Sequence, residues 1–358
     1  MRIKIIGTGS ALPDKIVTNE DLSRKLDTTD EWIRTRTGIR SRRIAEGKPE
    51  KKLLELSFRA AEQAIAMAGE RFAEFSRQEI DLIITATCTP DMAFPAASCR
   101  LQAALSAERA AAFDLSLACS GFLAALDTAS AYLESGRYRT VLVVGADVMS
   151  RMIDWTDRNS AVLFGDGAGA VLLSSDTRFT GAGAEQDCPD GLSVNRLCGG
   201  ENRTGADKQA VKKTELPHFI LRADGSGEEA LFCKAMYFNE AAPQKEYMDG
   251  RRVFEFAVRK VPEIIGEMLR ETGTEPSDIR YYILHQANYR IIEAVAKRIG
   301  EPIEKFPHNI ENYGNTTAAS IPILLDEMNR ARKLAEGDLI CLSGFGAGLS
   351  YGAALLEW

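Results

Sequence analysis

The sequence has few of the features that would place a protein in a membrane, outside the cell or on a nucleic acid. Its 358 residues contain no apolar run near the roughly 20 residues needed to cross a bilayer. Residues 1–7 are too short and too quickly interrupted to be a signal peptide. The net charge of −7 argues against non-specific nucleic-acid binding. We therefore expect a cytoplasmic protein with neither a membrane nor a nucleic acid as its partner.

Cysteine and histidine are too sparse for a metal site or a disulfide framework. The seven cysteines are scattered, without a C-x-x-C pair or a close Cys/His cluster, so we expect reduced thiols and no bound metal. Of the three histidines, His218 lies in a polar stretch and His308 in a loop beside Pro307. His285 follows the apolar run at 281–284, and the carboxyl end of a buried strand is where α/β sheets form sites. A hydrogen-bonded core histidine is the alternative for His285.

Neither glycine-rich stretch is a nucleotide-binding loop. The run GTGS at 7–10 is followed by Leu12 and Pro13 where a helix should open, and the third glycine is missing. The run GDGAGA at 165–170 lacks the Lys-Ser/Thr of a P-loop. We expect the second run to let backbones pack closely before a strand at 171–173. No cofactor is predicted.

What the chain does have is alternating helices and strands that repeat once. A helix at 53–68 and strands at 80–85 and 140–145 are matched by a helix at 253–269 and strands at 279–284 and 339–343. The offset is about 200 residues each time, which indicates an internal duplication of an α/β unit. We predict an N-terminal half at 1–179, an irregular polar excursion at 180–252 and a C-terminal half at 253–358.

Cys119 lies where a strand turns into a helix. The compact run at 110–115 reads as a buried strand, and apolar spacing predicts a helix at 122–135. The unpaired N–H groups of a helix N-terminus favour a thiolate, so we expect the pKa of Cys119 to be lowered and the thiol to be nucleophilic. The alternative is that Cys119 is a small buried hydrophobic residue.

Two further glycine turns follow in the second half. Asn315 opens a helix lined with small residues, where Asn is also a favoured N-cap, and Gly344 and Gly346 follow a strand. If the halves are related as the repeat indicates, the turns of Cys119, His285 and Asn315 converge on one pocket. The order Cys, His, Asn also occurs in papain-like hydrolases, but the C-G-S-C-W surroundings of that family are absent and its architecture is not duplicated.

The motifs resemble β-ketoacyl-acyl-carrier-protein synthase III of the thiolase superfamily, from the first strand to Tyr351 and Gly352. They occur in the family's order as DEWI with RTGI at 30–39, ACSGF at 118–122, DR with FGDGAGA at 157–170, HQAN at 285–288 and GNTTAAS at 314–320. The resemblance implies an α/β, thiolase-like fold of two duplicated halves packed as a five-layer α-β-α-β-α body.

The same resemblance implies an acyltransferase that starts fatty acid synthesis. Cys119 would take the acyl group of a short acyl-CoA, which is a substrate and not a cofactor. His285 and Asn315 would stabilise the enolate formed when malonyl-acyl carrier protein loses CO₂. Backbone N–H groups of Cys119, Gly346 and Ala347 would hold the oxyanion of the acyl group.

Binding residues also follow from the resemblance. It assigns CoA to Trp32, Arg36, Arg158 and Asn288, an acyl pocket completed across a homodimer to Phe94, and carrier-protein docking to Gln286, Arg290, Lys297 and Arg298. From the residues alone, Trp32 and Arg36 fit an ordinary solvated basic face equally well, as do the charges that follow His285. The segment at 202–229 is longer than the family pattern, which leaves open a different primer or a specialised pathway. A carrier-binding scaffold with an inactive site is disfavoured because Cys119, His285 and Asn315 are all present.

Overall fold

The computed structural model describes residues 3–180, 216–234 and 245–358. Two sheets form its framework. The first has the order β1-β7-β6-β4-β5, with bounds Lys4–Ala11, Asp166–Ser174, Thr140–Val148, Leu82–Ala86 and Ala111–Leu115. The second has the order β8-β13-β12-β11, with bounds His218–Ala223, Ser350–Glu357, Leu339–Gly346 and Tyr281–Leu284.

The two sheets repeat one topology. In the first sheet β6 pairs parallel with β4 and antiparallel with β7, and β7 pairs antiparallel with β1. In the second sheet β12 pairs parallel with β11 and antiparallel with β13, and β13 pairs antiparallel with β8. The duplication predicted from the helix and strand spacing is therefore present, strand for strand, with β5 added at the edge of the first sheet.

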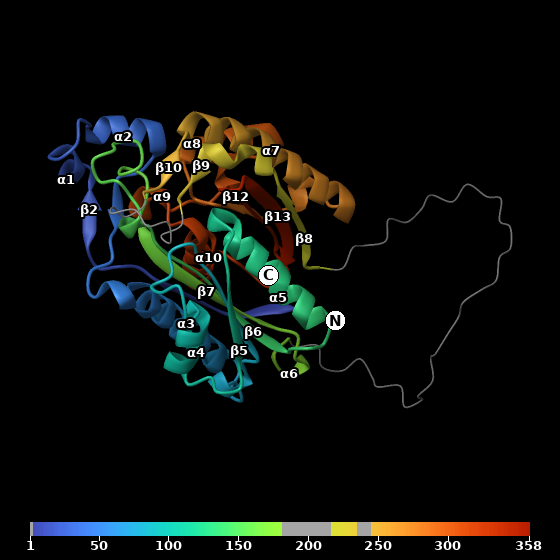
Figure 1. Cartoon of the computed structure of the whole chain (residues 1–358). Coiled ribbons are helices and arrows are strands. Elements are labelled where there is room, and N and C mark those ends of the chain that lie inside the picture. The colour runs from blue at the N-terminus through green and yellow to red at the C-terminus, as the bar shows by residue number, and fades with distance from the viewer. Residues whose placement is uncertain (1–2, 181–215, 235–244) are drawn as a thin grey trace, which may run out of the picture.

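Helices separate and cover the sheets, which gives the expected five layers (Figure 1). Helices α5 and α10 lie between the sheets, and their apolar side chains share one core with both. Helices α3 and α4 cover the outer face of the first sheet, and α7 and α8 that of the second. The bounds of these six helices are Gly121–Glu134 for α5, Ser320–Arg330 for α10, Lys52–Arg71 for α3, Ala97–Leu105 for α4, Gly250–Thr272 for α7 and Tyr289–Ile299 for α8. None of the helices within the described ranges is long and apolar enough to span a membrane.

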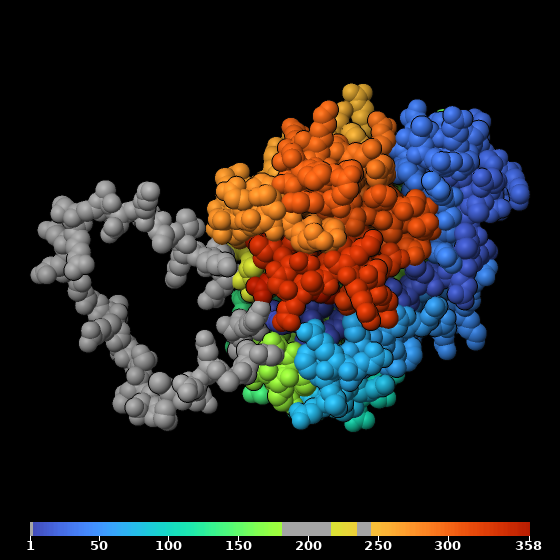
Figure 2. Space-filling model, turned by 180° about the vertical axis from the view of Figure 1, so that it is seen from behind, coloured from blue at the N-terminus to red at the C-terminus, as the bar shows by residue number. Residues whose placement is uncertain are grey.

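A small N-terminal unit lies against the C-terminal half. It contains β2, α1, α2 and β3, with bounds Ile16–Thr18, Asn19–Ser23, Asp30–Thr37 and Ser41–Arg43. The N–H of Arg40 donates at 2.9 Å to the carbonyl of Glu311, which lies in α9 (Ile310–Tyr313). Figure 2 shows this blue stretch along one side of the orange and red C-terminal half. Helix α2 is thereby held beside the start of α8.

Part of the expected excursion at 180–252 is regular structure. Strand β8 forms the edge of the second sheet through β13, and β9 (Leu231–Phe232) pairs with β10 (Tyr247–Met248). The short helix α6 (Thr177–Thr180) ends the first half. Residues 202–215 of the segment at 202–229 lie outside the described residues.

The glycine run at 165–170 packs as expected, although the strand begins earlier than predicted. Strand β7 already starts at Asp166 and includes most of the run. A Cβ on Gly169 would approach Pro322 of α10 to 2.7 Å, so the missing side chain allows helix α10 to lie close to the sheet. The other glycine stretch, at 7–10, lies within β1 and forms no loop.

Candidate active site

Two matched turns lie at the site, one with the candidate nucleophile and one directly after the candidate amide Asn315. The turn η3 (Ala118–Ser120) precedes α5, and η8 (Thr317–Ala319) precedes α10. Ala118 and Thr317, the first residues of these turns, both have a left-handed backbone, with φ of 43° and 51°. A left-handed conformation costs a residue with a side chain about 1–3 kcal/mol, and such strain is typically retained at functional sites. Cys119 and Ala318 are therefore equivalent positions in the two halves.

Cys119 is a buried thiol at the N-terminal end of α5, with 7% of its surface exposed. The sequence predicts a lowered pKa for this thiol, but the structure reverses that expectation. Burial raises the pKa of Cys119, and the carboxylates of Glu246 and Asp147 raise it further. Its own backbone N–H acts in the opposite direction. Loss of water around the sulfur therefore outweighs the effect of the backbone N–H on the pKa of this thiol.

His285 follows β11 and is fixed on two sides. Its N–H donates to the carbonyl of Ser343 at 2.8 Å, and its Nδ1 lies 2.7 Å from the hydroxyl oxygen of Ser320. The ring of Phe345 packs edge-on against it at 5.5 Å between centroids. Burial lowers the pKa of His285 to about 3, so the imidazole is neutral at physiological pH.

Asn315 is held by backbone bonds to the other half of the chain. Its N–H donates to the carbonyl of Leu163 at 2.8 Å, and its own carbonyl accepts from Gly165 at 3.0 Å. The Oδ1 of its side chain accepts from the N–H of Thr317 at 2.9 Å. Because Oδ1 is engaged, the NH₂ group is the part of this amide that remains to bind a ligand.

One cavity is lined by Cys119, His285 and Asn315 together. The rest of its wall is mostly apolar and comes from both halves, namely Leu163, Phe164, Leu231, Met248, Gly250, Val253, Phe254, Ala287, Asn288, Ile291, Phe345 and Gly346. The structure thus brings the three candidate catalytic residues to a shared space. An apolar chamber with a few convergent polar groups is the usual form of a small-molecule site.

Gly346 brings backbone up to the nucleophile. A Cβ at this position would approach the Cβ of Cys119 to 2.8 Å and its backbone nitrogen to 3.0 Å, so only glycine allows the contact. The carbonyl of the next residue, Ala347, accepts from the Ser350 hydroxyl at 3.0 Å. Gly346 therefore packs directly against the Cβ and backbone nitrogen of Cys119.

Two of the four candidate CoA residues, Arg36 and Arg158, lie against the ring of a third, Trp32. The guanidinium of Arg36 lies 4.9 Å from the ring centroid of Trp32, and that of Arg158 lies 5.0 Å from it. Asn288 connects this group to the cavity, since it lines the cavity and its Nδ2 donates to the carbonyl of Arg36 at 3.1 Å. An aromatic ring flanked by two cations, next to the cavity, is suited to an anionic ligand with a planar base.

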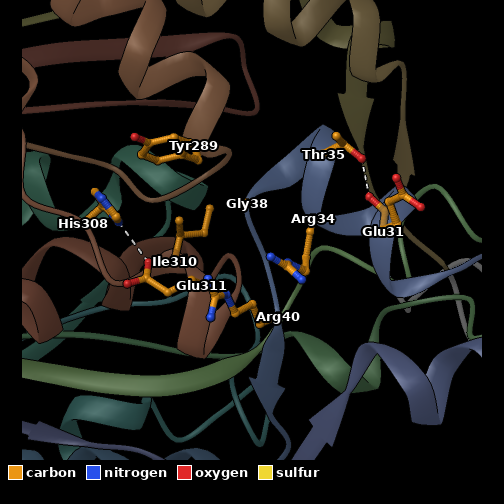
Figure 3. Close-up of a pocket in the computed structure, with 9 residues that line it drawn as sticks. All are labelled: Glu31, Arg34, Thr35, Gly38, Arg40, Tyr289, His308, Ile310 and Glu311. Carbon is orange, nitrogen blue, oxygen red and sulfur yellow. Dashed lines mark hydrogen bonds and ion pairs between the residues drawn. The ribbon is translucent and has the colours of Figure 1, made fainter.

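A second cavity lies beside helix α2 and contains none of the predicted site residues (Figure 3). His308 Nδ1 is 2.9 Å from a carboxylate oxygen of Glu311, and the His308 ring packs edge-on against Tyr289. His308, which has no obvious companion in the sequence, is therefore paired with a carboxylate. His218 is likewise paired, with Glu271 at 3.0 Å.

Most of the residues predicted for the acyl pocket and for carrier-protein docking lie at the surface, but one of them is buried. Phe94 is 85% exposed, and Arg290, Lys297 and Arg298 are exposed on α8. Gln286 is completely buried: its Nε2 donates to the carbonyl of Leu284 and its Oε1 accepts from Asn309. Gln286 therefore cannot meet a carrier protein at this surface. It instead anchors the segment that follows β11.

Sequence analysis overlooked three residues around the cavity. Ser320 contacts His285, Asp147 accepts hydrogen bonds from the turn that follows Asn315, and Glu246 has a carboxyl group near Cys119. The sequence offered a signal for Ser320, because this residue ends the run GNTTAAS. Asp147 and Glu246 have no local signal, since only the tertiary fold brings them to the site.

The chain matches known proteins along its whole length. The family model described as 3-oxoacyl-[acyl-carrier-protein] synthase III matches residues 113–186, and the model of that family's C-terminal part matches residues 269–358. The chain is 42% identical to a β-ketoacyl-[acyl-carrier-protein] synthase III of Acaryochloris marina, covering 99% of this chain and 97% of the relative.

Solved structures agree with this match. The crystal structure of 3-oxoacyl-[acyl-carrier-protein] synthase III from Aquifex aeolicus is similar with a TM-score of 0.82 at 40% identity, and all of both chains is covered. A priming β-ketosynthase from the R1128 polyketide biosynthetic pathway is similar with the same TM-score of 0.82 at 33% identity, covering 99% of this chain and 96% of that one.

Proposed function

The chain belongs to the β-ketoacyl-[acyl-carrier-protein] synthase III family, and from this premise we propose how its residues divide the reaction. It is an acyltransferase of the thiolase-like fold that carries out the condensation with which fatty acid synthesis begins. The proposal assigns roles to residues in two half-reactions. The observation that carries it is the single cavity shared by Cys119, His285 and Asn315.

In the first half-reaction Cys119 takes the acyl group of an acyl-CoA. Its sulfur attacks the thioester carbonyl, the bond to the CoA sulfur breaks, and the thiol proton ends on the departing CoA. The N–H groups of Cys119 and of the Gly346-Ala347 turn hold the oxyanion of the tetrahedral intermediate. The close approach of Gly346 to Cys119 supports this assignment. Because burial raises the pKa of this thiol, we propose that its proton leaves as the sulfur attacks.

In the second half-reaction malonyl-acyl carrier protein loses CO₂ at the same site. The resulting enolate carries its charge on the thioester oxygen, and the NH₂ group of Asn315 donates to it. His285 donates from Nε2. The Ser320 hydroxyl accepts from the N–H of Gln286 at 3.3 Å, so its own hydrogen is free to bond Nδ1 of His285 and keep the ring proton on Nε2. The carbanion then attacks the acyl group, and the Cys119 thiolate leaves and is reprotonated.

CoA lies across Trp32, Arg36, Arg158 and Asn288. The adenine stacks at Trp32, and the two guanidinium groups bind phosphates, a role that their places against this ring support. Asn288 binds the pantetheine arm where it enters the cavity. Anions prefer such sites because arginine offers several N–H donors in a planar arrangement.

The functional unit is a homodimer formed along the edge of the first sheet. Strand β5 ends that sheet and is only partly buried, and an edge strand of this kind is a surface that proteins usually cover. Phe94 projects from the loop before α4 with 85% of its surface exposed, which suits insertion into the acyl pocket of a partner subunit. The acidic carrier protein docks on Arg290, Lys297 and Arg298 of α8.

Mass spectrometry after incubation with a mixture of acyl-CoAs tests this function. We expect one acyl increment on the peptide that contains Cys119, and its mass identifies the primer. Cys341→Ala is the matched control, because Cys341 is also a buried thiol but does not line the cavity. It should acylate normally, whereas Cys119→Ala should neither acylate nor condense. Acylation of Cys119→Ala at the wild-type rate would contradict the proposal.

A further inference from the structure

Glu246 has a buried carboxyl oxygen for which the described residues offer no partner. Its Oε2 atom is enclosed and makes no hydrogen bond within the described part of the chain. The neighbouring cation does not compensate, because the Lys245 ammonium donates to the carbonyl of Ile153 at 2.9 Å. Burying a carboxyl group without a partner costs free energy, so such a group in a native protein calls for a specific explanation.

The backbone aims Glu246 toward the cavity of Cys119. Its N–H donates to the carbonyl of Met152 at 3.0 Å, which fixes the start of β10. Met248, two residues later, lines that cavity. Alternate residues of an extended chain face the same side, so Glu246 and Met248 share a face, and Tyr247 between them points outward with 53% of its surface exposed.

The carboxyl group of Glu246 is coupled to the nucleophile electrostatically. Burial is the main cause that raises the pKa of the Cys119 and Cys88 thiols, and Glu246, where it is ionised, raises both further. Burial, and then the charge of Asp147, raise the pKa of Glu246 itself to about 8. At neutral pH the group is mostly a protonated acid, which offers one O–H donor and a carbonyl acceptor.

The wall of the cavity that contains Cys119 is mostly apolar. Leu231, Met248, Leu163 and Phe164 line the cavity that contains Cys119. A few polar groups in an apolar pocket fix the orientation and identity of a ligand. A ligand group that both donates and accepts a hydrogen bond, as a hydroxyl does, complements a protonated carboxyl group.

We propose that Glu246 is a specificity-determining residue of the acyl pocket, and that it selects a short acyl-CoA whose acyl chain carries a hydroxyl group. This inference rests on the proposed transfer of an acyl group to Cys119. The primer would carry a hydroxyl group, which a pocket with only apolar side chains would disfavour. The hydroxyl satisfies the buried Oε2 atom, whereas a plain alkyl chain leaves it without a partner.

Competition between acyl-CoAs of equal carbon number tests the proposal. The rate of acylation of Cys119 is measured by mass spectrometry with butyryl-CoA and with each enantiomer of 3-hydroxybutyryl-CoA. We expect the wild type to prefer one hydroxyacyl substrate by about tenfold or more, because a buried polar group left unpaired penalises the alkyl substrate. Glu246→Leu should reverse the preference, and Glu246→Gln should keep the preference for the hydroxyacyl group. Tyr247→Phe, on the opposite face, should leave the ratio unchanged.

The outcomes separate this inference from the proposed function. If butyryl-CoA acylates Cys119 and the ratio is the same in the wild type and in Glu246→Leu, the inference is overturned and the function stands. If no acyl-CoA labels Cys119 in the wild type, both fail. Glu246→Leu should also raise Tm, since it removes the unpartnered carboxyl group. If that variant does not fold, a wild-type ratio near one, or loss of the preference in Tyr247→Phe but not in Glu246→Gln, still overturns the inference.

Discussion

The carboxylate of Asp147 accepts a hydrogen bond from the hydroxyl of Thr317, 170 residues further along the chain. The same oxygen accepts from the N–H of Ala318 at 3.2 Å, and the other oxygen accepts from Cys88 and Thr89 at 2.9 Å each. Asp147 lies one residue before the end of strand β6, so one carboxylate ties the first sheet to the turn of the second half. Through Thr317, whose N–H bonds Oδ1 of Asn315, it also fixes the orientation of that amide.

Asp147→Asn should therefore impair condensation more than acylation. The variant replaces one accepting oxygen of Asp147 with an NH₂ group that faces other hydrogen-bond donors. This disorders the turn η8 and the Asn315 side chain. We expect kcat for condensation to fall by about tenfold or more and Tm to fall as well, since an unsatisfied buried group costs roughly 1–3 kcal/mol. The measurements are steady-state kinetics with malonyl-acyl carrier protein and thermal unfolding.

Asp81→Asn is the matched control for this prediction. Asp81 accepts from the N–H groups of Arg139 and Thr140 at the opposite end of β6, far from the turn η8. It should lower Tm and leave kcat unchanged. Equal losses of kcat in the two variants would mean that Asp147 acts only through stability.

Ser320→Ala should reduce the condensation step and spare acylation of Cys119. Without the hydroxyl, Nδ1 of His285 loses its partner at 2.7 Å and the ring is free to move its proton to Nδ1, away from the substrate. We expect kcat for condensation to fall by about tenfold and the rate of acylation to change less than threefold. Ser343→Ala removes a buried hydroxyl bond on β12 without touching His285 Nδ1, and it should behave like the wild type. Equal condensation rates in the two variants would refute the role of Ser320.

The neutral state of His285 makes stability depend on pH in a defined direction. The pKa is about 3 in the folded protein against 6.5 for an ordinary solvated imidazole, so below pH 6.5 the unfolded chain binds a proton that the folded protein does not. The free energy of unfolding therefore decreases as pH falls from 6.5. Relative to His285→Gln, the wild type should lose about 1–2 kcal/mol between pH 6.5 and 5, as measured by urea unfolding. If the free energy of unfolding had the same pH dependence in both proteins, His285 would be free to take up a proton in the folded protein, which would contradict the prediction.

Arg36→Ala should weaken acyl-CoA binding without changing the chemistry. Arg36 lies against Trp32, and loss of one charged contact to phosphate predicts about a tenfold rise in KM for acyl-CoA with kcat nearly constant. Arg34→Ala is the control on the same helix, because Arg34 is paired with Asp30 at 3.3 Å and lines the second cavity. A similar rise in KM for Arg34→Ala would indicate a general effect of charge.

Local pattern was sufficient for the duplicated α/β units and for singling out three candidate residues, whereas the layered fold and the catalytic roles followed from the family resemblance. Apolar spacing identified the paired helices and strands because each is buried on a regular face, and the glycine turns marked Cys119 and Asn315. Strand β8 escaped prediction because its short run, at His218–Ala223, lies in a polar stretch and gains its place only by pairing with β13.

Properties that depend on burial were not accessible from the sequence. The helix N-terminus next to Cys119 predicts a lowered pKa, but the surrounding apolar atoms reverse the shift. Gln286 follows His285 directly and looks available to a partner, yet the fold buries it. The partners of Asp147 and the environment of Glu246 come from segments distant in sequence, so no local motif could reveal them.

Following the acyl group on Cys119 tests the central claim most directly. The wild type and Asn315→Ala are acylated with acyl-CoA, freed of excess substrate and mixed with malonyl-acyl carrier protein, and the label on the Cys119 peptide is followed by mass spectrometry. We predict that both proteins become acylated and that Asn315→Ala discharges its acyl group at least about 10²-fold more slowly, because one hydrogen-bond donor to the enolate is missing. Discharge at equal rates, or a label on another residue, would contradict the account.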